Sequence, residues 1–158
     1  MTFSIGQNVI EIEIKALNLL KKSISKVQFE KAVSYLYKTS GKIIISGIGK
    51  SGHIGSKISS TLSSIGSSSF FLHPSEANHG DLGMIKKEDC MILISNSGES
   101  SELLNLILFC KKIKIPIISI TSELKSTLAK QSSAVLLIPK NVEACPLELA
   151  PTSSTTCA

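Results

Sequence analysis

Five short apolar runs constrain the fold of this 158-residue chain more than any other feature of its sequence. The first is the isoleucine triplet at residues 43–45, and the others lie at residues 69–72, 90–94, 116–120 and 134–138. Each run is long enough for a β-strand and too short for a helix. Runs that are apolar throughout are typical of strands buried on both faces of a parallel sheet.

Segments with helical spacing separate these runs. They lie at residues 51–65, 100–112 and 124–130, and a short helix is expected within residues 74–84. Strands that alternate with helices form a parallel sheet covered on both faces, and right-handed crossovers restrict its strand order. We therefore predict an α/β fold, a doubly wound five-stranded parallel sheet in the flavodoxin-like order 2-1-3-4-5, flanked by helices.

The N-terminal part of the chain differs from the rest. Residues 5–39 have apolar positions at helical spacing and predict two helices. A chain of this length is expected to form one domain with a substantial core. We expect the helices of residues 1–40 to pack on a main domain formed by residues 41–158.

Composition excludes several classes of partner. The net charge of +5 comes from lysine alone, since the sequence has no arginine. Those lysines are scattered and aromatic residues are only 4% of the chain, so no nucleic-acid surface is expected. No apolar run approaches the roughly 20 residues of a membrane span, so no membrane partner is expected. The four cysteines lack metal-binding spacing and are typical of free thiols in a reducing cytoplasm.

Two turns that follow apolar runs indicate a binding site. Residues 47–53 read Gly-Ile-Gly-Lys-Ser-Gly-His, and residues 95–100 read Ser-Asn-Ser-Gly-Glu-Ser. A turn that ends a strand and opens a helix presents backbone N–H groups and a positive dipole end to an anion. The predicted strand order places its switch point between strands 1 and 3, so both turns should meet at one crevice. Without arginine, a phosphate there must be held by N–H groups, hydroxyls and a lysine.

The first turn is similar to two nucleotide-binding patterns but satisfies neither. Glycines at positions 47, 49 and 52 match the dinucleotide fingerprint. That fingerprint also needs an acidic residue after the second strand, whereas this chain has His73 there. Lys50 also places a bulky cation inside the glycine turn. A nucleotide P-loop fails because Ile44 stands where its first glycine belongs.

Charged residues beside the turns have structural and chemical interpretations. The positive charge of Lys50 at the start of a helix opposes the helix dipole, so we expect a nearby anion to balance it. Asn96 and Glu99 have the spacing of a capping box for the helix that follows, which makes Glu99 structural. Glu102 lies one turn into that helix and could compensate its dipole. Glu143, in a loop after the fifth run, could be a simple exposed charge.

Histidines form a third group of candidates. His73 and His79 lie close in sequence to Glu76 and Asp81, but their spacing matches no strong zinc pattern. Hydrogen bonds from histidine to sugar hydroxyls are the favoured interpretation. His53, at the start of a helix, is interpreted as structural.

Four long motifs resemble one family, in the right order. They are residues 46–55 (SGIGKSGHIG), residues 73–83 (HPSEANHGDLG), residues 95–102 (SNSGESSE), and residues 143–146 (EACP) with 149–155 (LAPTSST). Together they are similar to the sugar isomerase (SIS) domain of the arabinose-5-phosphate isomerases. The resemblance covers the chain from about residue 41 to its end.

The resemblance implies an activity and a set of site residues. The family interconverts D-arabinose 5-phosphate and D-ribulose 5-phosphate, supplying the Kdo sugar of lipopolysaccharide, as a cytoplasmic homotetramer acting on a phosphorylated pentose. It implies catalytic positions at Lys50, Glu102 and Glu143. It implies no required cofactor, and incidental or inhibitory zinc at His73. The substrate-binding positions that it implies are Gly49, Ser51, Gly66, Ser67, His73, His79, Ser95, Ser97 and Ser100.

These residue types suit aldose–ketose isomerisation through an enediolate. A carboxylate base with a pKa raised by burial removes a proton next to the carbonyl, which is worth roughly 10²–10⁴ in rate. A cation that faces the developing oxyanion contributes about 3–4 kcal/mol. We expect Glu143 to be the base at C2, Lys50 to stabilise the enediolate, and Glu102 to carry or orient the proton; the division between the two glutamates is open.

The chain departs from the family pattern at its C-terminal end. The family continues into a longer helix, a segment with a further catalytic histidine and usually two regulatory CBS domains, whereas this sequence ends at Ala158. We expect a truncated isomerase domain with weak or no activity of its own. The alternative is a non-catalytic SIS module that senses sugar phosphates. A sensor has no use for Lys50, Glu102 and Glu143 together, so the three favour the enzyme.

Overall fold

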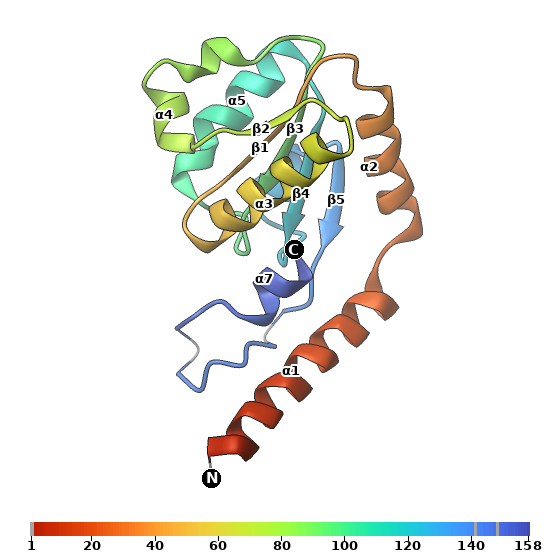
Figure 1. Cartoon of the computed structure of the whole chain (residues 1–158). Coiled ribbons are helices and arrows are strands. Elements are labelled where there is room, and N and C mark those ends of the chain that lie inside the picture. The colour runs from red at the N-terminus through yellow and green to blue at the C-terminus, as the bar shows by residue number, and fades with distance from the viewer. Residues whose placement is uncertain (1, 141, 148) are drawn as a thin grey trace.

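One five-stranded parallel sheet forms the centre of the structure (Figure 1). The structure is a computed structural model that describes residues 2–140, 142–147 and 149–158. The sheet has the order β2-β1-β3-β4-β5, which confirms the predicted fold class and strand order. Its strands are β1 (Ile43–Gly47), β2 (Ser69–Phe71), β3 (Cys90–Ile94), β4 (Ile117–Thr121) and β5 (Ala134–Leu137).

Helices cover both faces of the sheet, as the apolar runs predict. On one face, Ile44 and Met91 pack with residues of α4 (Pro74–Asn78), α5 (Leu104–Ile113) and α6 (Thr127–Gln131). On the other face, Ile45 and Ile92 pack with residues of α2 (Lys26–Lys38) and α3 (Lys50–Ser64). Every residue of β1, β3 and β4 is buried. Full burial of an isoleucine contributes about 1.5–3 kcal/mol, so these central strands hold the two layers together.

Two glycines let α3 lie unusually close to β1. A Cβ atom on Gly55 would stand 2.9 Å from Cγ2 of Ile45, and one on Gly52 would stand 2.8 Å from the carbonyl oxygen of Gly47. Glycine inside a helix costs about 1 kcal/mol relative to alanine. Here the close approach requires it, and it fixes the helix that follows the first turn against the end of its strand.

Three short elements complete the connections. Two 3₁₀ helices, η1 (Asp81–Met84) and η2 (Ser101–Leu103), precede β3 and α5, and α7 (Ser153–Cys157) follows the loop after β5. The helix expected at residues 100–112 therefore begins as a 3₁₀ turn and becomes α-helical from Leu104.

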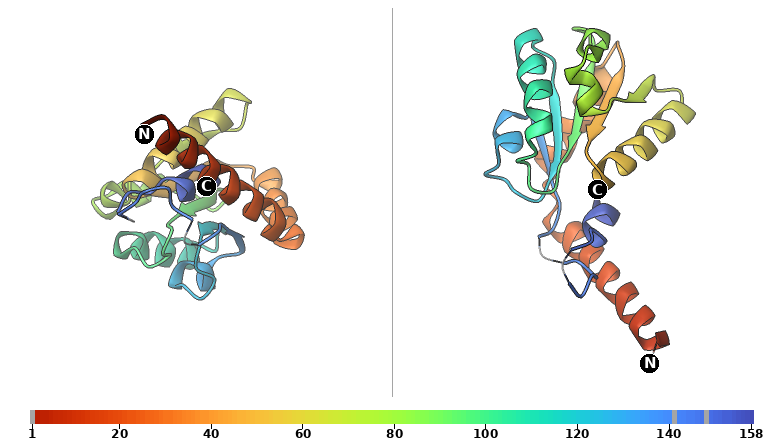
Figure 2. Two further views of the ribbon diagram at one scale, coloured as in Figure 1. Left: turned by 90° about the horizontal axis from the view of Figure 1, so that it is seen from below. Right: turned by 90° about the vertical axis from the view of Figure 1, so that its left-hand side faces the viewer.

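The two N-terminal helices have different surroundings. Helix α2 packs against the sheet, and its Gln28 side chain accepts a hydrogen bond of 3.0 Å from the backbone N–H of Val135 in β5. Helix α1 (Thr2–Ser23) instead runs beyond the carboxyl end of the sheet and packs against α7 (Figures 1 and 2). Ala16 is its one buried residue among those described.

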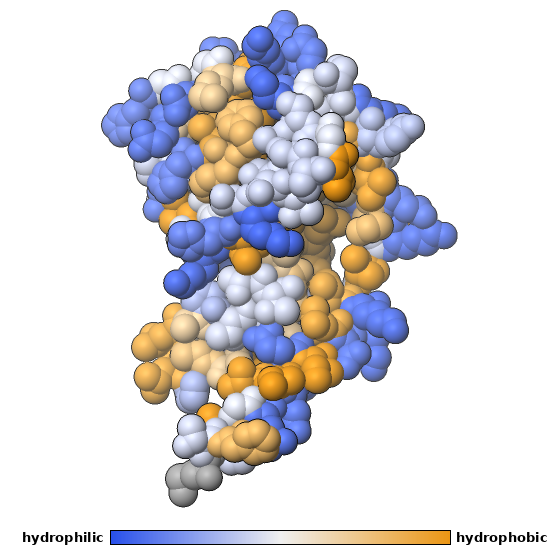
Figure 3. Space-filling view, viewed as in Figure 1, coloured by the Kyte–Doolittle hydropathy of each residue, from blue (hydrophilic) through white to orange (hydrophobic). Residues whose placement is uncertain are grey.

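Most large apolar side chains of α1 are exposed, and apolar surface is visible in this lower part of the molecule (Figure 3). They are Phe3, Ile5, Val9, Ile10, Ile14, Leu17 and Leu19. None of the helices in the described ranges combines the length and the apolar character needed to cross a membrane.

Candidate functional site

The two turns predicted to bind an anion, residues 47–53 and 95–100, lie side by side at the carboxyl edge of the sheet. Gly47, the last residue of β1, is paired with Ile94, the last residue of β3. The turns that follow them therefore begin on neighbouring strands. A cavity of about 140 Å³ lies here, and Lys50, Asn96 and Ser154 contribute to its wall. The convergence expected from the strand order is confirmed.

Gly49 shapes the first turn. Its φ of 58° lies in the left-handed region that glycine adopts without strain, and it directly precedes α3. Because glycine has no side chain to cap the helix, the first N–H groups of α3 are available to an anion. Lys50 is exposed and lines the cavity, and Ser51 lines it beside Lys50. Lys50 takes part in neither of the two ion pairs found among the described residues.

The second turn is held by its own hydroxyl groups. The buried Ser95 hydroxyl lies 2.8 Å from that of Ser100 and accepts a hydrogen bond of 3.1 Å from the Gly98 N–H. The exposed Ser97 hydroxyl accepts one of 3.3 Å from the Glu99 N–H. Ser95 thus fixes the shape of the turn, whereas Ser97 lies on its outer side, open to a ligand.

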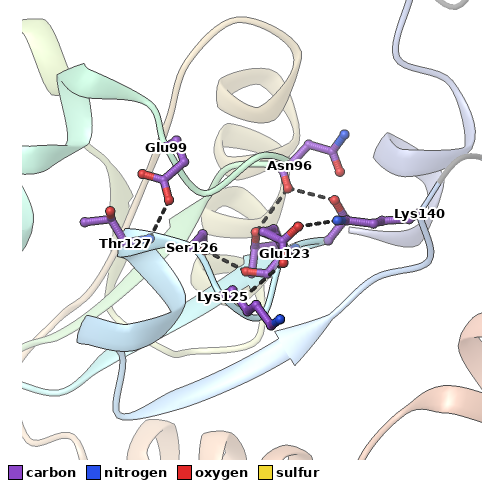
Figure 4. A network of polar contacts seen from close by, with 9 residues as sticks. Asn96, Glu99, Glu123, Lys125, Ser126, Thr127 and Lys140 are labelled. Carbon is purple, nitrogen blue, oxygen red and sulfur yellow. Dashed lines mark hydrogen bonds and ion pairs between the residues drawn. The ribbon is translucent and has the colours of Figure 1, made fainter.

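Glu99 caps a different helix from the one predicted. Its carboxylate accepts a hydrogen bond of 2.7 Å from the Thr127 N–H at the start of α6, which holds the pKa of Glu99 below its usual value (Figure 4). The predicted capping box with Asn96 is therefore wrong, because Glu99 turns away from its own helix. Glu102 is exposed at the start of that helix and accepts a hydrogen bond of 3.2 Å from the Ser101 hydroxyl.

Asn96 connects the second turn to the next loop. Its carbonyl oxygen accepts hydrogen bonds from the Thr121 hydroxyl at 3.1 Å and the Ser122 hydroxyl at 2.9 Å. Beside it, Glu123 forms an ion pair with Lys140, and the hydrogen bond from Lys140 lowers the pKa of Glu123 (Figure 4). Lys140 lies just before the segment that bears Glu143, so this network anchors the base of that segment.

Glu143 is half-buried and has three donors. Its carboxylate accepts hydrogen bonds from the Thr152 N–H and hydroxyl, both at 2.7 Å, and from the Ser154 N–H at 3.4 Å. Burial alone raises the pKa of Glu143, but the hydrogen bonds from Ser154 and Thr152 outweigh it and hold the pKa below its usual value. The expected upward shift is therefore wrong for this arrangement, because the donors favour the charged carboxylate.

Two of the three histidines line a second groove of about 280 Å³, whose wall includes Gly49, His53 and His73. His73 caps α4, because its Nδ1 accepts a hydrogen bond of 3.3 Å from the Ser75 N–H. Its ring packs edge to face against that of Phe71, with 6.4 Å between the ring centroids. His79 is exposed at the end of α4. His53, interpreted as structural, is exposed beside the first turn.

Gly66 and Ser67 lie elsewhere in the chain's fold. They follow α3 and precede β2, and the neighbouring Ser68 carbonyl accepts a hydrogen bond from the N–H of Ile43, the first residue of β1. They are therefore at the amino edge of the sheet, opposite the two turns. Within one copy of the chain, the structure does not bring them to the other candidate residues.

Comparison with protein families assigns this fold and its motifs. A model of the SIS domain matches residues 35–158. The chain belongs to the SIS domain family. This SIS domain is 51% identical over 148 residues to the arabinose 5-phosphate isomerase KdsD of Francisella tularensis subsp. tularensis, covering 92% of this chain and 45% of the relative. It is 48% identical over 151 residues to KdsD of Salmonella typhi, covering 96% of this chain and 46% of that relative. The chain therefore spans less than half the length of either relative.

One solved structure supports the same assignment, and a second shares the fold. This SIS domain is 38% identical to the E. coli CFT073 protein c3406, solved in complex with arabinose 5-phosphate, with a TM-score of 0.93, covering 99% of this chain and 82% of that one. The sugar isomerase domain of the RpiR transcription factor from Sphaerobacter thermophilus is 18% identical, with a TM-score of 0.80 and coverage of 96% and 84%. At that identity the likeness shows a shared fold alone.

Some site residues of this SIS domain escaped the sequence analysis. Ser154 and Thr155 line the cavity with Lys50, and Thr152 holds Glu143. The family motif at residues 149–155 and the hydroxyl-rich run at residues 152–156 were the signals that could have indicated them. No group of three or more His, Cys, Asp or Glu side chains within the described ranges could hold a metal ion. Incidental zinc at His73 stays a prediction.

Proposed function

We propose that this SIS domain interconverts D-arabinose 5-phosphate and D-ribulose 5-phosphate. The observation that carries the proposal is the meeting of the Gly47 and Ile94 strand ends, which gathers an anion-type helix start, Lys50 and hydroxyl groups around one cavity. The relative at 51% identity bears the name of this activity, and c3406 was solved with arabinose 5-phosphate. Together they favour a phosphorylated pentose over other anions.

The two turns would hold the phosphate group. N–H groups at the start of α3 and the hydroxyls of Ser51 and Ser97 supply donors, and the dipole of the 15-residue helix favours a negative charge. His53 and His73, in the adjoining groove, are placed to contact sugar hydroxyls. This binding positions the sugar carbonyl next to Lys50, and such positioning is a large part of catalysis.

The chemistry then needs a base and a cation. In the aldose, a carboxylate takes the proton from C2, the C2–H electron pair forms the C1–C2 double bond, and the carbonyl oxygen becomes an oxyanion. The proton then returns to C1, the O2–H electron pair forms the C2=O double bond, and the O2 proton passes to the O1 oxyanion, which gives the ketose. We assign the base to Glu143, whose donors keep it ionised, and the oxyanion to Lys50. The exposed Glu102 would carry the second proton.

The wider setting is part of the same proposal. We propose that the reaction supplies the Kdo sugar of lipopolysaccharide, and that the protein works as a cytoplasmic homotetramer without a required cofactor. The exposed apolar side chains of α1 support assembly, because monomeric proteins rarely expose large apolar patches.

A solvent-exchange experiment tests the function and the roles together. Arabinose 5-phosphate is incubated with the chain in D₂O, and ribulose 5-phosphate formation and deuterium incorporation are followed by NMR. The assignment is supported if Glu143→Gln loses both turnover and the exchange of the C2 proton for deuterium. Exchange that survives in Glu143→Gln rules out Glu143 as the base. Binding of the sugar phosphate without turnover in the unsubstituted chain would favour the sensor.

A further inference from the structure

Glu13 lies where the N-terminal helix meets the functional site. Helix α1 passes below the sheet in Figure 1 and packs against α7. At this contact, the Ser153 hydroxyl donates a hydrogen bond of 3.0 Å to Oε1 of Glu13. The second carboxylate oxygen, Oε2, is buried and has no hydrogen-bond partner among the described residues. A carboxylate from the far N-terminal end of the chain therefore ends against the helix that supports Glu143.

Burial of this carboxylate is costly and needs a reason. A buried oxygen without a partner loses its hydration, which destabilises the fold. The core does not require Glu13, because Ala16 is the one buried residue of α1 among those described, and both core clusters are formed by other elements. An apolar residue would fill the same contact at lower cost. The retained interaction is the hydrogen bond to Ser153.

Ser153 links Glu13 to the proposed base. It lies between Thr152 and Ser154, whose backbone N–H groups both donate to Glu143. Cys157 lies one turn further along α7. Burial raises the pKa of its thiol, and the negative charges of Glu13 and Glu143 raise it further, which shows that both carboxylates are near this helix. Both carboxylates thus contact the start of α7 and lie close enough to Cys157 to affect its thiol.

We propose that Glu13 is a positioning residue for the isomerase site. By accepting the Ser153 hydrogen bond, it holds the start of α7 so that the Thr152 and Ser154 N–H groups point at Glu143. This inference rests on the proposed function for its catalytic consequence. The holding of α7 itself can be measured without any turnover.

The experiment compares Glu13→Ala, Glu13→Gln and the control Glu11→Ala in the full chain. Glu11 is exposed on the same helix, so its replacement removes an equal charge without the contact. Glu13→Ala is expected to lower kcat by about 10- to 100-fold, because small misplacements of catalytic groups are expensive. KM should change little, since the phosphate-binding turns are untouched. Glu13→Gln keeps an acceptor oxygen for Ser153 and should restore most of kcat.

Two further measurements separate this role from a general structural one. Ser153→Ala should reproduce the loss, and the double variant with Glu13→Ala should be no worse than either single variant, because both break the same hydrogen bond. Amide hydrogen exchange at Thr152 and Ser154 should accelerate in Glu13→Ala and remain unchanged in Glu11→Ala. Unfolding of Glu13→Ala is controlled for by Glu13→Gln and by circular dichroism.

The outcomes distinguish the two proposals. If the unsubstituted chain lacks isomerase activity, the proposed function fails, and amide exchange alone decides whether Glu13 holds α7. If Glu13→Ala matches Glu11→Ala in both kcat and exchange, or if its loss adds to that of Ser153→Ala, the positioning role is overturned.

Discussion

The hydroxyl of Thr152 donates a hydrogen bond of 2.7 Å to the carboxylate of Glu143 and accepts one of 2.8 Å from the N–H of Ala144. One side chain thus closes the loop between the end of β5 and α7 and sets the orientation of the proposed base. Because the carboxylate also accepts hydrogen bonds from two backbone N–H groups, those of Thr152 and Ser154, its charged form is favoured.

Thr152→Val should therefore change the pH dependence of activity. Loss of the hydroxyl removes one donor to the charged carboxylate, so the pKa of Glu143 should rise toward its ordinary value. The base must be ionised to act, so the acid limb of the kcat profile should move to higher pH. The control is Thr156→Val on the same helix, whose hydroxyl reaches only the Thr152 carbonyl. An acid limb that moves equally in both variants would contradict this role for Thr152.

Replacement of Glu99 should lower the stability of the fold without lowering activity. Glu99→Ala removes the acceptor of the Thr127 N–H at the start of α6, which Ser126 also caps, and should lower the melting temperature at neutral pH with little effect on kcat. Because the Thr127 hydrogen bond lowers the pKa of Glu99 in the folded state, its stabilisation is present above the unfolded pKa and is lost as pH falls through the folded pKa. The melting difference from the unsubstituted chain should therefore vanish in acid.

Glu102→Ala is expected to show the reverse behaviour. Its carboxylate is exposed, and among the described residues its one hydrogen bond is from the neighbouring Ser101 hydroxyl, so thermal melting should be unchanged. If Glu102 carries a proton, kcat should fall by roughly 10²-fold or more. A Glu102→Ala variant with full turnover would remove Glu102 from the mechanism.

Gly98 is the position in the second turn where a side chain cannot be accommodated. Its φ is 67°, and a Cβ atom there would lie 2.2 Å from the Ser126 hydroxyl oxygen. Gly98→Ala should lower the free energy of unfolding by at least about 1–3 kcal/mol, measured by urea denaturation. Gly6→Ala in α1 is the contrast, because its Cβ meets nothing within 4 Å and alanine favours a helix by about 1 kcal/mol. Equal effects at the two positions would show that the turn adapts.

The sheet and the meeting of its two turns could be predicted from the sequence because they follow from local pattern and chain topology. Apolar runs identify the strands, and the switch point then places the end of β1 beside that of β3. Local reasoning also identified Lys50 as a candidate site residue, since a cation at the start of a helix is unfavourable unless an anion lies nearby. These inferences need no knowledge of how distant side chains pair.

The errors concern contacts between residues distant in sequence. Glu99 has the spacing to cap its own helix, yet it caps α6, 28 residues away, because the fold brings a second helix start within reach. The Glu143 pKa depends on donors 9 and 11 residues later, which no periodicity reveals. Gly66 and Ser67 are site candidates through family resemblance alone and stay a prediction; they lie at the amino edge of the sheet, between α3 and β2.

Ser46 should tolerate loss of its hydroxyl, with a gain in stability. It is fully buried in β1 beside the first turn, and its Oγ has no hydrogen-bond partner among the described residues. A buried polar group without a partner destabilises the folded state, so Ser46→Ala should raise the free energy of unfolding by about 1 kcal/mol in urea denaturation. Ser119 in β4 is the matched control, since it is equally buried but its hydroxyl donates to the Ala134 carbonyl at 3.5 Å. Ser119→Ala should lower stability or leave it unchanged, and a comparable loss in Ser46→Ala would mean that its hydroxyl is satisfied in solution.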